Sequence, residues 1–336
     1  LAVVGFGTHS NAQTLVGPED VNDGIKLWLD ADKSYLFGNK DCSSSPISTS
    51  GQDVKCWKDR SGNNAHVTID HWHPTRSDYG APTYLDDKIG GEPVLEFDTV
   101  QKDGLINVLG SKSWDGDYTL FLVVKNMFSD LTSNSLKKRA YFSSGPNDRD
   151  HMQIGHGGGG RKKQTWVWMQ NNQNKSTKFE TNSKYPRIYA VRGEGGGRTT
   201  YTDGDEKFSN TKNNGANFSR YQINLNRGTN KYHNSYIAEV VLYSRNLNDC
   251  EFYDVHKYLA DKYELRGIPI AADSLTPVHI NLADGLYEAG GGSQYVIIDD
   301  TADTVDDRTT IHMQNGDDIL YIKGWAGTNP GSPVLA

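Results

Sequence analysis

Apolar residues recur at every second position in many short stretches of this chain. In GIKLWLDAD, residues 24–32, the side chains of Ile25, Leu27 and Leu29 follow this period. A period of two places alternate side chains on opposite faces of a β-strand. Similar runs occupy residues 93–97, 118–125, 164–170, 187–193, 220–226 and 235–244.

Turn-forming residues separate these runs. Asp115–Gly116, Asp203–Gly204 and Asn213–Asn214–Gly215 have the composition of tight turns. Many short alternating strands divided by Asn, Asp and Gly predict an all-β fold, an antiparallel β-sandwich. The run 118–125 is almost continuously apolar, so we expect a central strand there.

Residues 248–265 change to a helical period, because Phe252, Val255, Leu259 and Tyr263 recur at spacings of three and four. The flanking signals are a capping box of Asn248 with Glu251, a hydrophobic staple of Leu247 with Phe252, and a stop at Gly267 and Pro269. We therefore predict one C-terminal surface helix with a single apolar face. Cys250, in its first turn, is interpreted as a small buried side chain rather than a nucleophile, because no base accompanies it.

Acidic residues accumulate at the end of the chain. Residues 270–336 contain ten acids and two bases, a net charge of −8, whereas the whole chain carries −7. Such a change marks a domain boundary near residue 270. We expect a main domain at residues 20–267 and a small acidic β module at residues 268–336, with strands in VHINL, QYVIID, TTIHM and DILYIKGW.

Residues 1–19 are interpreted as an N-terminal strand that pairs with the acidic module, on the basis of the run LAVVGFG. The alternative is the end of a signal peptide, although no basic region precedes it. The negative net charge argues against nucleic acid as a partner. No apolar run approaches the roughly 18 residues of a membrane-spanning helix, so we expect no membrane insertion.

Two of the three cysteines, Cys42 and Cys56, flank a serine-rich loop and lie 14 positions apart. A local pair that closes a polar loop is typical of disulfides in an oxidising compartment. The alternative is three free thiols in a cytosolic protein.

Five segments, taken in order, carry a resemblance to a known family. They are residues 24–32, 57–63, 91–98, 116–125 and 236–263, and the last is the most specific: a strand ending in EVVLY, an NLND turn and the closing helix. Together they resemble the concanavalin A-like, laminin-G-type jelly-roll domains of bacterial surface proteins. The resemblance implies two antiparallel sheets over about residues 20–267 and a role in binding glycans or peptides, often with calcium.

The acidic module carries a second resemblance. Its segment NGDDIL, residues 315–320, is similar to one copy of the calcium-binding repeat of RTX-type adhesins. One copy is too few for a calcium-loaded β-roll, which needs several stacked units. The two resemblances together imply the ligand-binding region of a bacterial surface adhesin, an extracellular and monomeric module of a larger chain.

Catalysis is a weaker interpretation. Retaining glycoside hydrolases of the jelly-roll fold carry an E-x-D-x-x-E strand, which holds two carboxyl groups about 5 Å apart. The nearest match here is Glu96 with Asp98, and Gln101 stands where the third acid belongs. We therefore predict a protein that is not an enzyme, with a polysaccharide-degrading enzyme as the less favoured class.

Calcium is the expected cofactor, because carboxylate and amide oxygens are its preferred ligands. One proposed site uses Asp59 and Asn63 in the turn-rich segment 59–64; the alternative is an Asx-turn network that only shapes the loop. The other lies in the acidic module, where the alternative is a solvated acidic face; its ligands would be Asp299, Asp300, Asp317 and Asp318. His71 and His73 have the spacing of a zinc pair on a strand, with a polar loop or edge strand as the favoured alternative.

The segment 143–168 has the most ligand-like composition and is interpreted as a loop. Glycines let a ligand approach the backbone, and the polar side chains supply donors and acceptors. The predicted ligand-binding residues are Asn147, Asp148, Asp150, His151, His156, Gly157 and Gly158. Trp166 and Trp168 suit sugar stacking, or alternate with Val167 in a core strand. The predicted function is calcium-assisted binding of a cell-surface glycan, with calcium-dependent binding of a peptide or protein as the alternative.

Overall fold

The computed structural model describes residues 15–69, 80–109, 113–127, 139–144, 151–156, 164–170, 175–181, 185–195, 197–210, 216–225 and 232–265, and five short strands beyond residue 277. By internal contacts the chain divides into two units, Leu1–Arg266 and Gly267–Ala336. The predicted strand at residues 1–7 and its pairing with the acidic module lie outside the described residues.

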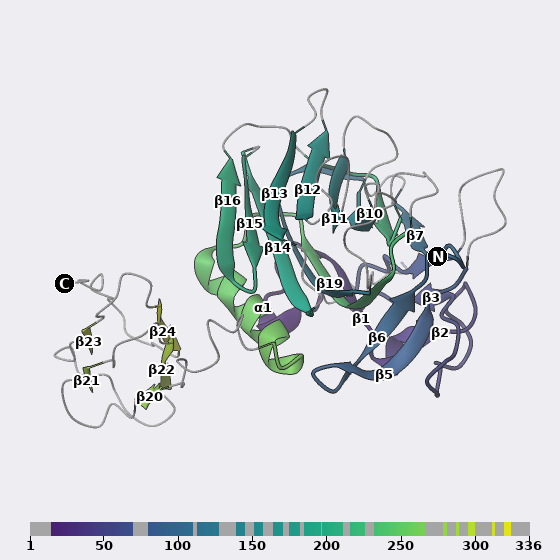
Figure 1. The fold of residues 1–336 in the computed structure, drawn as a ribbon, viewed down its shortest axis with the longest axis horizontal. Coiled ribbons are helices and arrows are strands. Elements are labelled where there is room, and N and C mark those ends of the chain that lie inside the picture. The colour runs from purple at the N-terminus through teal and green to yellow at the C-terminus, as the bar shows by residue number, and fades with distance from the viewer. Residues whose placement is uncertain are drawn as a thin grey trace, which may run out of the picture. The chain divides into compact units, whose positions relative to one another are not determined.

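Two antiparallel sheets form the first unit (Figure 1). Sheet A has eight strands in the order β16-β15-β14-β9-β19-β6-β5, and β1 also pairs with β19. Its strands are β1 (Ile25–Asp30), β5 (Thr83–Ile89), β6 (Glu92–Phe97), β9 (Tyr118–Asn126), β14 (Arg187–Glu194), β15 (Gly197–Thr202), β16 (Asp205–Asn210) and β19 (Ser235–Tyr243).

Sheet B has nine strands in the order β13-β12-β11-β10-β18-β7-β4-β3-β2. Its strands are β2 (Leu36–Phe37), β3 (Cys56–Trp57), β4 (Val67–Thr68), β7 (Leu105–Val108), β10 (Arg139–Ser143), β11 (His151–His156), β12 (Gln164–Gln170), β13 (Lys175–Thr181) and β18 (Arg220–Ile223). A short ribbon pairs β8 (Trp114–Gly116) with β17 (Ala216–Phe218). Two single-turn 3-10 helices, η1 (Pro18–Asp20) and η2 (Lys33–Tyr35), flank β1. The predicted all-β sandwich is therefore confirmed.

Sheet A is buried on both faces, which explains the apolar run in β9. Leu120, Leu122 and Val124 point into the core between the sheets. Phe121 and Val123 point the other way, into a second core beneath the helix. Strand β9 lies between β14 and β19, so the predicted central position is also confirmed.

Helix α1 (Asp249–Lys262) covers the outer face of sheet A (Figure 1). Its capping box is formed as predicted: Glu251 N donates to Asn248 Oδ1, and Asn248 N donates to Glu251 Oε2, each over 3.0 Å. The side chains of Phe252, Val255 and Leu259 are buried. None of the described helices is long and apolar enough to cross a membrane.

The predicted disulfide between Cys42 and Cys56 is formed, and Cys250 is free. Two local predictions are wrong. Cys250 is exposed rather than buried, because it lies on the helix face that points away from the sheet. Asp115 and Gly116 belong to strand β8 and pair with β17, so they do not form a turn.

The second unit contains parallel strands, all of them short. Strands β20 (Val278–Ile280), β22 (Tyr295–Asp299) and β24 (Ile319–Lys323) pair in that order. Strands β21 (Tyr287–Glu288) and β23 (Ile311–His312) form a separate parallel pair. The strands thus alternate between two sheets along the chain, an arrangement typical of a parallel β-solenoid.

Candidate binding site

Strand β11 separates the predicted ligand-binding residues into two groups. The segment 143–168, interpreted from its composition as a loop, contains the end of β10, all of β11 and the start of β12. His151 pairs with Gln170 at one end of β11, and His156 pairs with Thr165 at the other. At about 3.4 Å per residue the two histidine Cα atoms lie roughly 17 Å apart. One small ligand does not span that distance, so the predicted residues mark two alternative sites.

The two sheets have a common end at which several strands meet. In sheet A, Ser235 at the start of β19 pairs with both Phe97 of β6 and Asn126 of β9. In sheet B, Ser143 at the end of β10 pairs with Gln222 of β18 and with Gln153 near the start of β11. The short connection from β6 to β7 joins the two sheets here. We call this end of the sandwich the polar end.

The polar end contains a group of buried polar side chains. They belong to residues with at most 7% exposure: Asp103, Asn126, Ser143, Ser144, Gln222, Asn224, His233 and Ser235. Buried polar groups are costly unless they are hydrogen-bonded, so such a group of residues needs internal partners.

Asn224 lies at the centre of these hydrogen bonds. Its Nδ2 donates to the carbonyl oxygen of Asp103 over 3.0 Å, and its Oδ1 accepts from Ser235 Oγ over 3.3 Å. Its own backbone N donates to the carbonyl oxygen of Tyr141. Asn224 has a φ of 58°, a left-handed conformation that Asn tolerates better than most residues. The hydrogen bonds of Asn224, which follows β18, tie the connection before β7 to strand β10 and to the start of β19.

Two further contacts fix the surrounding connections. Ser143 Oγ donates to Gln222 Oε1 over 2.8 Å and is also 3.0 Å from the carbonyl oxygen of Leu225. Asn234 Oδ1 accepts from Thr99 N over 2.6 Å, and the carbonyl oxygen of Asn234 accepts from Met127 N. The polar end is therefore a rigid base from which several connections extend.

The predicted residues Asn147, Asp148 and Asp150 lie outside the described residues, but the structure fixes where their segment begins and ends. Ser144 and His151 bound this segment, and both lie at the polar end. Gly157 and Gly158 also lie outside the described residues, and they follow His156 at the opposite end. Trp166 and Trp168 lie in strand β12, which is the strand alternative for that pair.

Asp59 and Asn63 hold their loop together. Asp59 Oδ1 accepts from the backbone N atoms of Trp28 and Ser61, over 2.9 and 3.0 Å. Its Oδ2 accepts from Ser61 Oγ and Ala65 N, over 2.8 and 3.0 Å. Asn63 Nδ2 donates to the carbonyl oxygen of Ile25 over 2.9 Å. All four bonds to the buried Asp59 carboxylate come from the protein, so the geometry favours the Asx-turn alternative over a calcium site.

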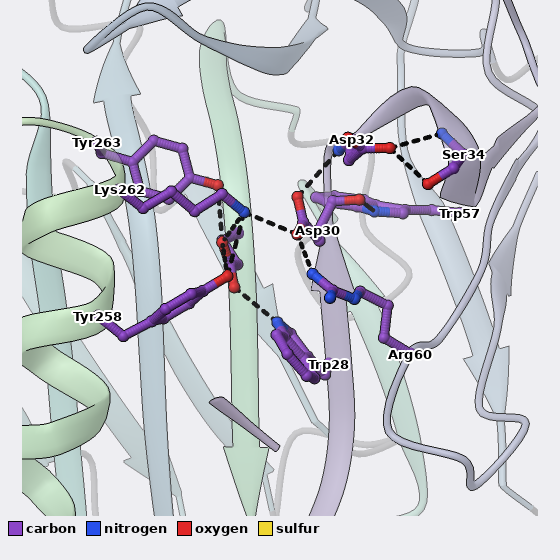
Figure 2. A network of polar contacts seen from close by, with 10 residues as sticks. Trp28, Asp30, Asp32, Ser34, Trp57, Arg60, Tyr258, Lys262 and Tyr263 are labelled. Atoms are coloured by element: carbon purple, nitrogen blue, oxygen red, sulfur yellow. Dashed lines mark hydrogen bonds and ion pairs between the residues drawn. The ribbon is translucent and has the colours of Figure 1, made fainter. Parts of the chain in front are cut away.

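A second group of charges lies between helix α1 and strands β1 and β19 (Figure 2). Asp30 and Glu239 pair directly across these two strands. Burial, followed by the charge of Asp30, raises the pKa of Glu239. Two close carboxyl groups, one with a raised pKa, are a feature of glycoside hydrolase sites. Sequence reasoning did not single out this pair.

The surroundings of the pair leave no place for a substrate. Glu239 has no exposed surface. Its Oε1 accepts from Trp28 Nε1 over 2.6 Å, and its Oε2 accepts from Lys262 Nζ and Tyr263 Oη, each over 2.8 Å. Asp30 Oδ2 binds Lys262 Nζ at 2.7 Å and also the Arg60 guanidinium. The network is a structural joint that holds the last turn of the helix to the sheet, as Figure 2 shows.

The remaining predicted metal-binding and catalytic residues lie partly outside the described residues. Among the described residues, no three His, Cys, Asp or Glu side chains come together to hold a metal. His71 and His73 lie outside the described residues, as do Asp300, Asp317 and Asp318. Asp299 lies at the end of β22, where it pairs in register with Lys323 of β24. Glu96 lies in β6 opposite Tyr236, and Asp98 Oδ1 accepts from Val100 N.

The buried polar residues of the polar end were missed by sequence reasoning. Gln222 and Asn224 occupy the polar positions of an alternating strand, and that pattern predicts exposure to solvent. The only available signal was the density of Asn, Ser and His in residues 222–235, between two apolar strands.

Comparisons with known proteins give similarity of fold alone. No model of a known protein family matches the chain, and no curated protein matches it in sequence. A search of solved structures finds the binding domain of Paraclostridial Mosquitocidal Protein 1, with 13% identity, a TM-score of 0.49 and coverage of 70% of this chain and 52% of that one. The chain thus spans about half the length of that structure.

Two other matches are similar in extent. Domain 4 of AbnA, an extracellular GH43 arabinanase from Geobacillus stearothermophilus solved with arabinotriose, is 17% identical, with a TM-score of 0.46 and coverage of 69% of this chain and 98% of that one. A structure of botulinum neurotoxin type C, a toxin whose cell entry depends on interaction with two ganglioside molecules, is 15% identical. Its TM-score is 0.44, and the match covers 71% of this chain and 52% of that one.

Proposed function

We propose that this chain is a non-enzymatic, ligand-binding region of a secreted bacterial adhesin, and that it binds a cell-surface glycan at the polar end with the help of calcium. The observation that carries the proposal is the rigid base of buried, hydrogen-bonded side chains at that end. Binding residues commonly lie on connections that a rigid scaffold positions. The segment containing Asn147, Asp148 and Asp150 begins and ends on this base.

The chemistry of this segment suits a sugar. Vicinal hydroxyl groups need acceptors and donors at fixed spacing, and carboxylate and amide side chains supply both. Calcium bound by Asp148 or Asp150 would contact ligand oxygens directly. The ion takes about six to eight oxygen ligands, so these side chains leave coordination positions open for sugar hydroxyl groups. The disulfide Cys42–Cys56 supports an extracellular location, since such bonds persist in oxidising compartments.

The alternative ligand is a peptide or protein, and one observation favours it. Val100 and Tyr185 are 84% and 61% exposed. Val100 lies between β6 and β7, and Tyr185 shortly precedes β14, so both lie at the polar end. Exposed apolar and aromatic side chains are typical contacts for protein partners.

The experiment is a glycan array run beside a peptide display screen, each with calcium and with a chelator. Calcium-dependent signals on the glycan array alone would support the proposal, and signals in the peptide screen alone would support the alternative. Release of reducing or unsaturated sugars that is lost in Glu96→Gln would contradict the non-enzymatic part. No calcium-dependent signal in either screen would refute calcium-assisted binding.

A further inference from the structure

Asp103 has an unusual environment in the connection between β6 and β7. The residue is 1% exposed. Its Oδ2 accepts from Asp98 N over 2.8 Å, while its Oδ1 is buried without a hydrogen-bond partner. Nearly all buried polar atoms in proteins have a partner, so an exception requires an explanation.

Neither a metal ion nor a water molecule fits against Oδ1 on the Gly80 side. A Cβ atom built on Gly80 would stand only 2.1 Å from Oδ1 of Asp103 and 2.5 Å from the carbonyl oxygen of Gln101. The Gly80 methylene group therefore already fills the space that these two oxygens face. Protonation of the carboxyl group adds no heavy atom, and it removes the charge that burial disfavours.

Burial has the largest effect on the pKa of Asp103 and raises it, whereas the hydrogen bond from Asp98 N lowers it. The charges of Asp98, Asp53 and Glu96 then raise the pKa by repulsion, from the loop, from the segment before β5 and from β6. Together these effects raise the pKa of Asp103 from its ordinary 3.8 to about 7. Neighbouring Gly80, Ala81 and Pro82 carry no charge, and Asn224, which follows β18 and contacts Asp103, is neutral.

We infer that Asp103 is a proton switch: its neutral carboxyl group holds the 98–104 loop closed, and its ionisation opens the loop at the polar end. The closed loop is well defined by hydrogen bonds. Asp103 N donates to the carbonyl oxygen of Asp98, Val100 N donates to Asp98 Oδ1, and Thr99 N donates to Asn234 Oδ1. Opening moves the exposed tip at Val100 and releases Asn234 from Thr99.

The direction of the pH effect follows from proton binding. Between pH 3.8 and about 7 the closed loop holds a proton that the open loop has lost. The closed form is therefore fully favoured below pH 3.8, loses stability as the pH rises towards 7, and changes little above that value. Any effect on ligand affinity rests on the proposed function; the opening of the loop does not.

Hydrogen exchange of the backbone amides tests the switch. Protection factors for Asp98, Thr99, Val100 and Asp103 are measured from pH 4.5 to 8.5, corrected for the intrinsic rate. We expect them to fall about tenfold per pH unit up to about pH 7 and then to level off. Asp103→Asn, which resembles the neutral carboxyl group, should give a flat profile. Asp117→Asn is the matched control, because Asp117 also accepts from a backbone amide, that of Gly195, and is exposed; its profile should follow the wild type.

A flat wild-type profile, or an Asp103→Asn profile that keeps the wild-type slope, would overturn the inference. If Asp103→Asn does not fold, the carbon-13 shift of the Asp103 carboxyl group decides: a midpoint near 4 contradicts the switch, and one near 7 supports it. The glycan array is then probed at pH 5 and pH 8, and an array signal that changes between these values in wild type but not in Asp103→Asn would link the loop to binding. Exchange that follows pH without any array signal would refute the proposed function and leave the switch standing.

Discussion

Nζ of Lys262 lies 2.8 Å from Oε2 of Glu239, a carboxylate with no exposed surface. The same ammonium group is 2.7 Å from Asp30 Oδ2. One lysine of the helix therefore pairs with carboxyl groups from two strands of the sheet, β19 and β1. The attraction of the two carboxylates raises the pKa of Lys262 against the opposing effect of burial.

Replacement of Lys262 by Met should therefore strongly destabilise the folded protein. The variant leaves Glu239 and Asp30 buried beside a single remaining cation, Arg60. Removal of one partner of a buried ion pair costs about 3–5 kcal/mol. We expect this loss in the free energy of unfolding, measured by denaturant titration at pH 7. Lys257→Met is the control, because its pair with Asp261 is exposed and should contribute no more than about 1 kcal/mol. Equal losses in the two variants would contradict the structural role of the network.

His256 should make the first unit sensitive to acid. Its ring packs against Gly204, its Nε2 has no hydrogen-bond partner, and burial lowers its pKa from 6.5 to about 4. The unfolded chain binds a proton on this residue between those values and the folded chain does not. The contribution of His256 to the free energy of unfolding is therefore fully present above pH 6.5. It is lost as the pH decreases towards 4, by at most about 3 kcal/mol.

The measurement compares wild type with His256→Gln by denaturant titration at pH 4.5 and pH 7. The difference between the two proteins isolates this group from others that titrate in the same range. Stability that falls equally in both proteins would refute the assignment to His256.

The disulfide predicts a defined labelling pattern. Alkylation without reduction, followed by mass spectrometry, should label only the exposed thiol of Cys250. The double variant Cys42→Ser with Cys56→Ser opens a loop of about 15 residues and should lower stability by about 3 kcal/mol. Three labelled cysteines in native material would contradict the bond.

Substitutions at the two ends of β11 should separate the two alternative sites. Asp150→Ala should weaken ligand binding at least about tenfold, or about 1.4 kcal/mol, without unfolding the domain. His156→Ala, at the opposite end of β11 and roughly 17 Å from His151 along the strand, should leave affinity unchanged. Binding is measured on the ligand found by the screens, and melting temperature is the folding control. The reverse pattern would place the site at the opposite end, near Gly157 and Gly158.

Calcium should stabilise the second unit if its acids bind the ion. A hundredfold excess over the dissociation constant raises stability by about 2.7 kcal/mol. We expect the melting temperature of this unit to rise with calcium and to fall with chelator, and Asp317→Ala to reduce the effect while leaving ligand affinity intact. An unchanged melting curve across the titration would exclude Asp299, Asp300, Asp317 and Asp318 as a calcium site.

Local patterns predicted most of the secondary structure. The alternation in 118–125 and the capping residues Asn248 and Glu251 depend on near neighbours, and the structure contains the corresponding strand and helix. Strand direction depends on distant pairing instead. Nothing in the sequence of QYVIID or DILYIKGW indicates that β22 and β24 are parallel.

The sites were harder to predict for the same reason. Glu239 meets Trp28, Asp30 and Lys262 only after folding, and no motif joins these positions. Asp103 looks like an ordinary turn residue in DTVQKD, because its burial depends on Gly80 and Asn224. The composition of segment 143–168 suggested a binding loop, but composition does not reveal that β11 separates the two ends of the segment.

The pairing of β1 with β19 has a consequence for how the molecule is made. Trp28 and Glu239, which meet across these strands, are 211 positions apart in the chain. Contacts between such distant positions make folding slow, because a long loop must close before they form. At the roughly 5–20 residues per second of protein synthesis, β1 waits about 10–40 s for its partner strand. During that interval the apolar side chains of Ile25, Leu27 and Leu29 remain without their final neighbours, so we expect aggregation of nascent chains to depend strongly on chaperones that bind this first strand.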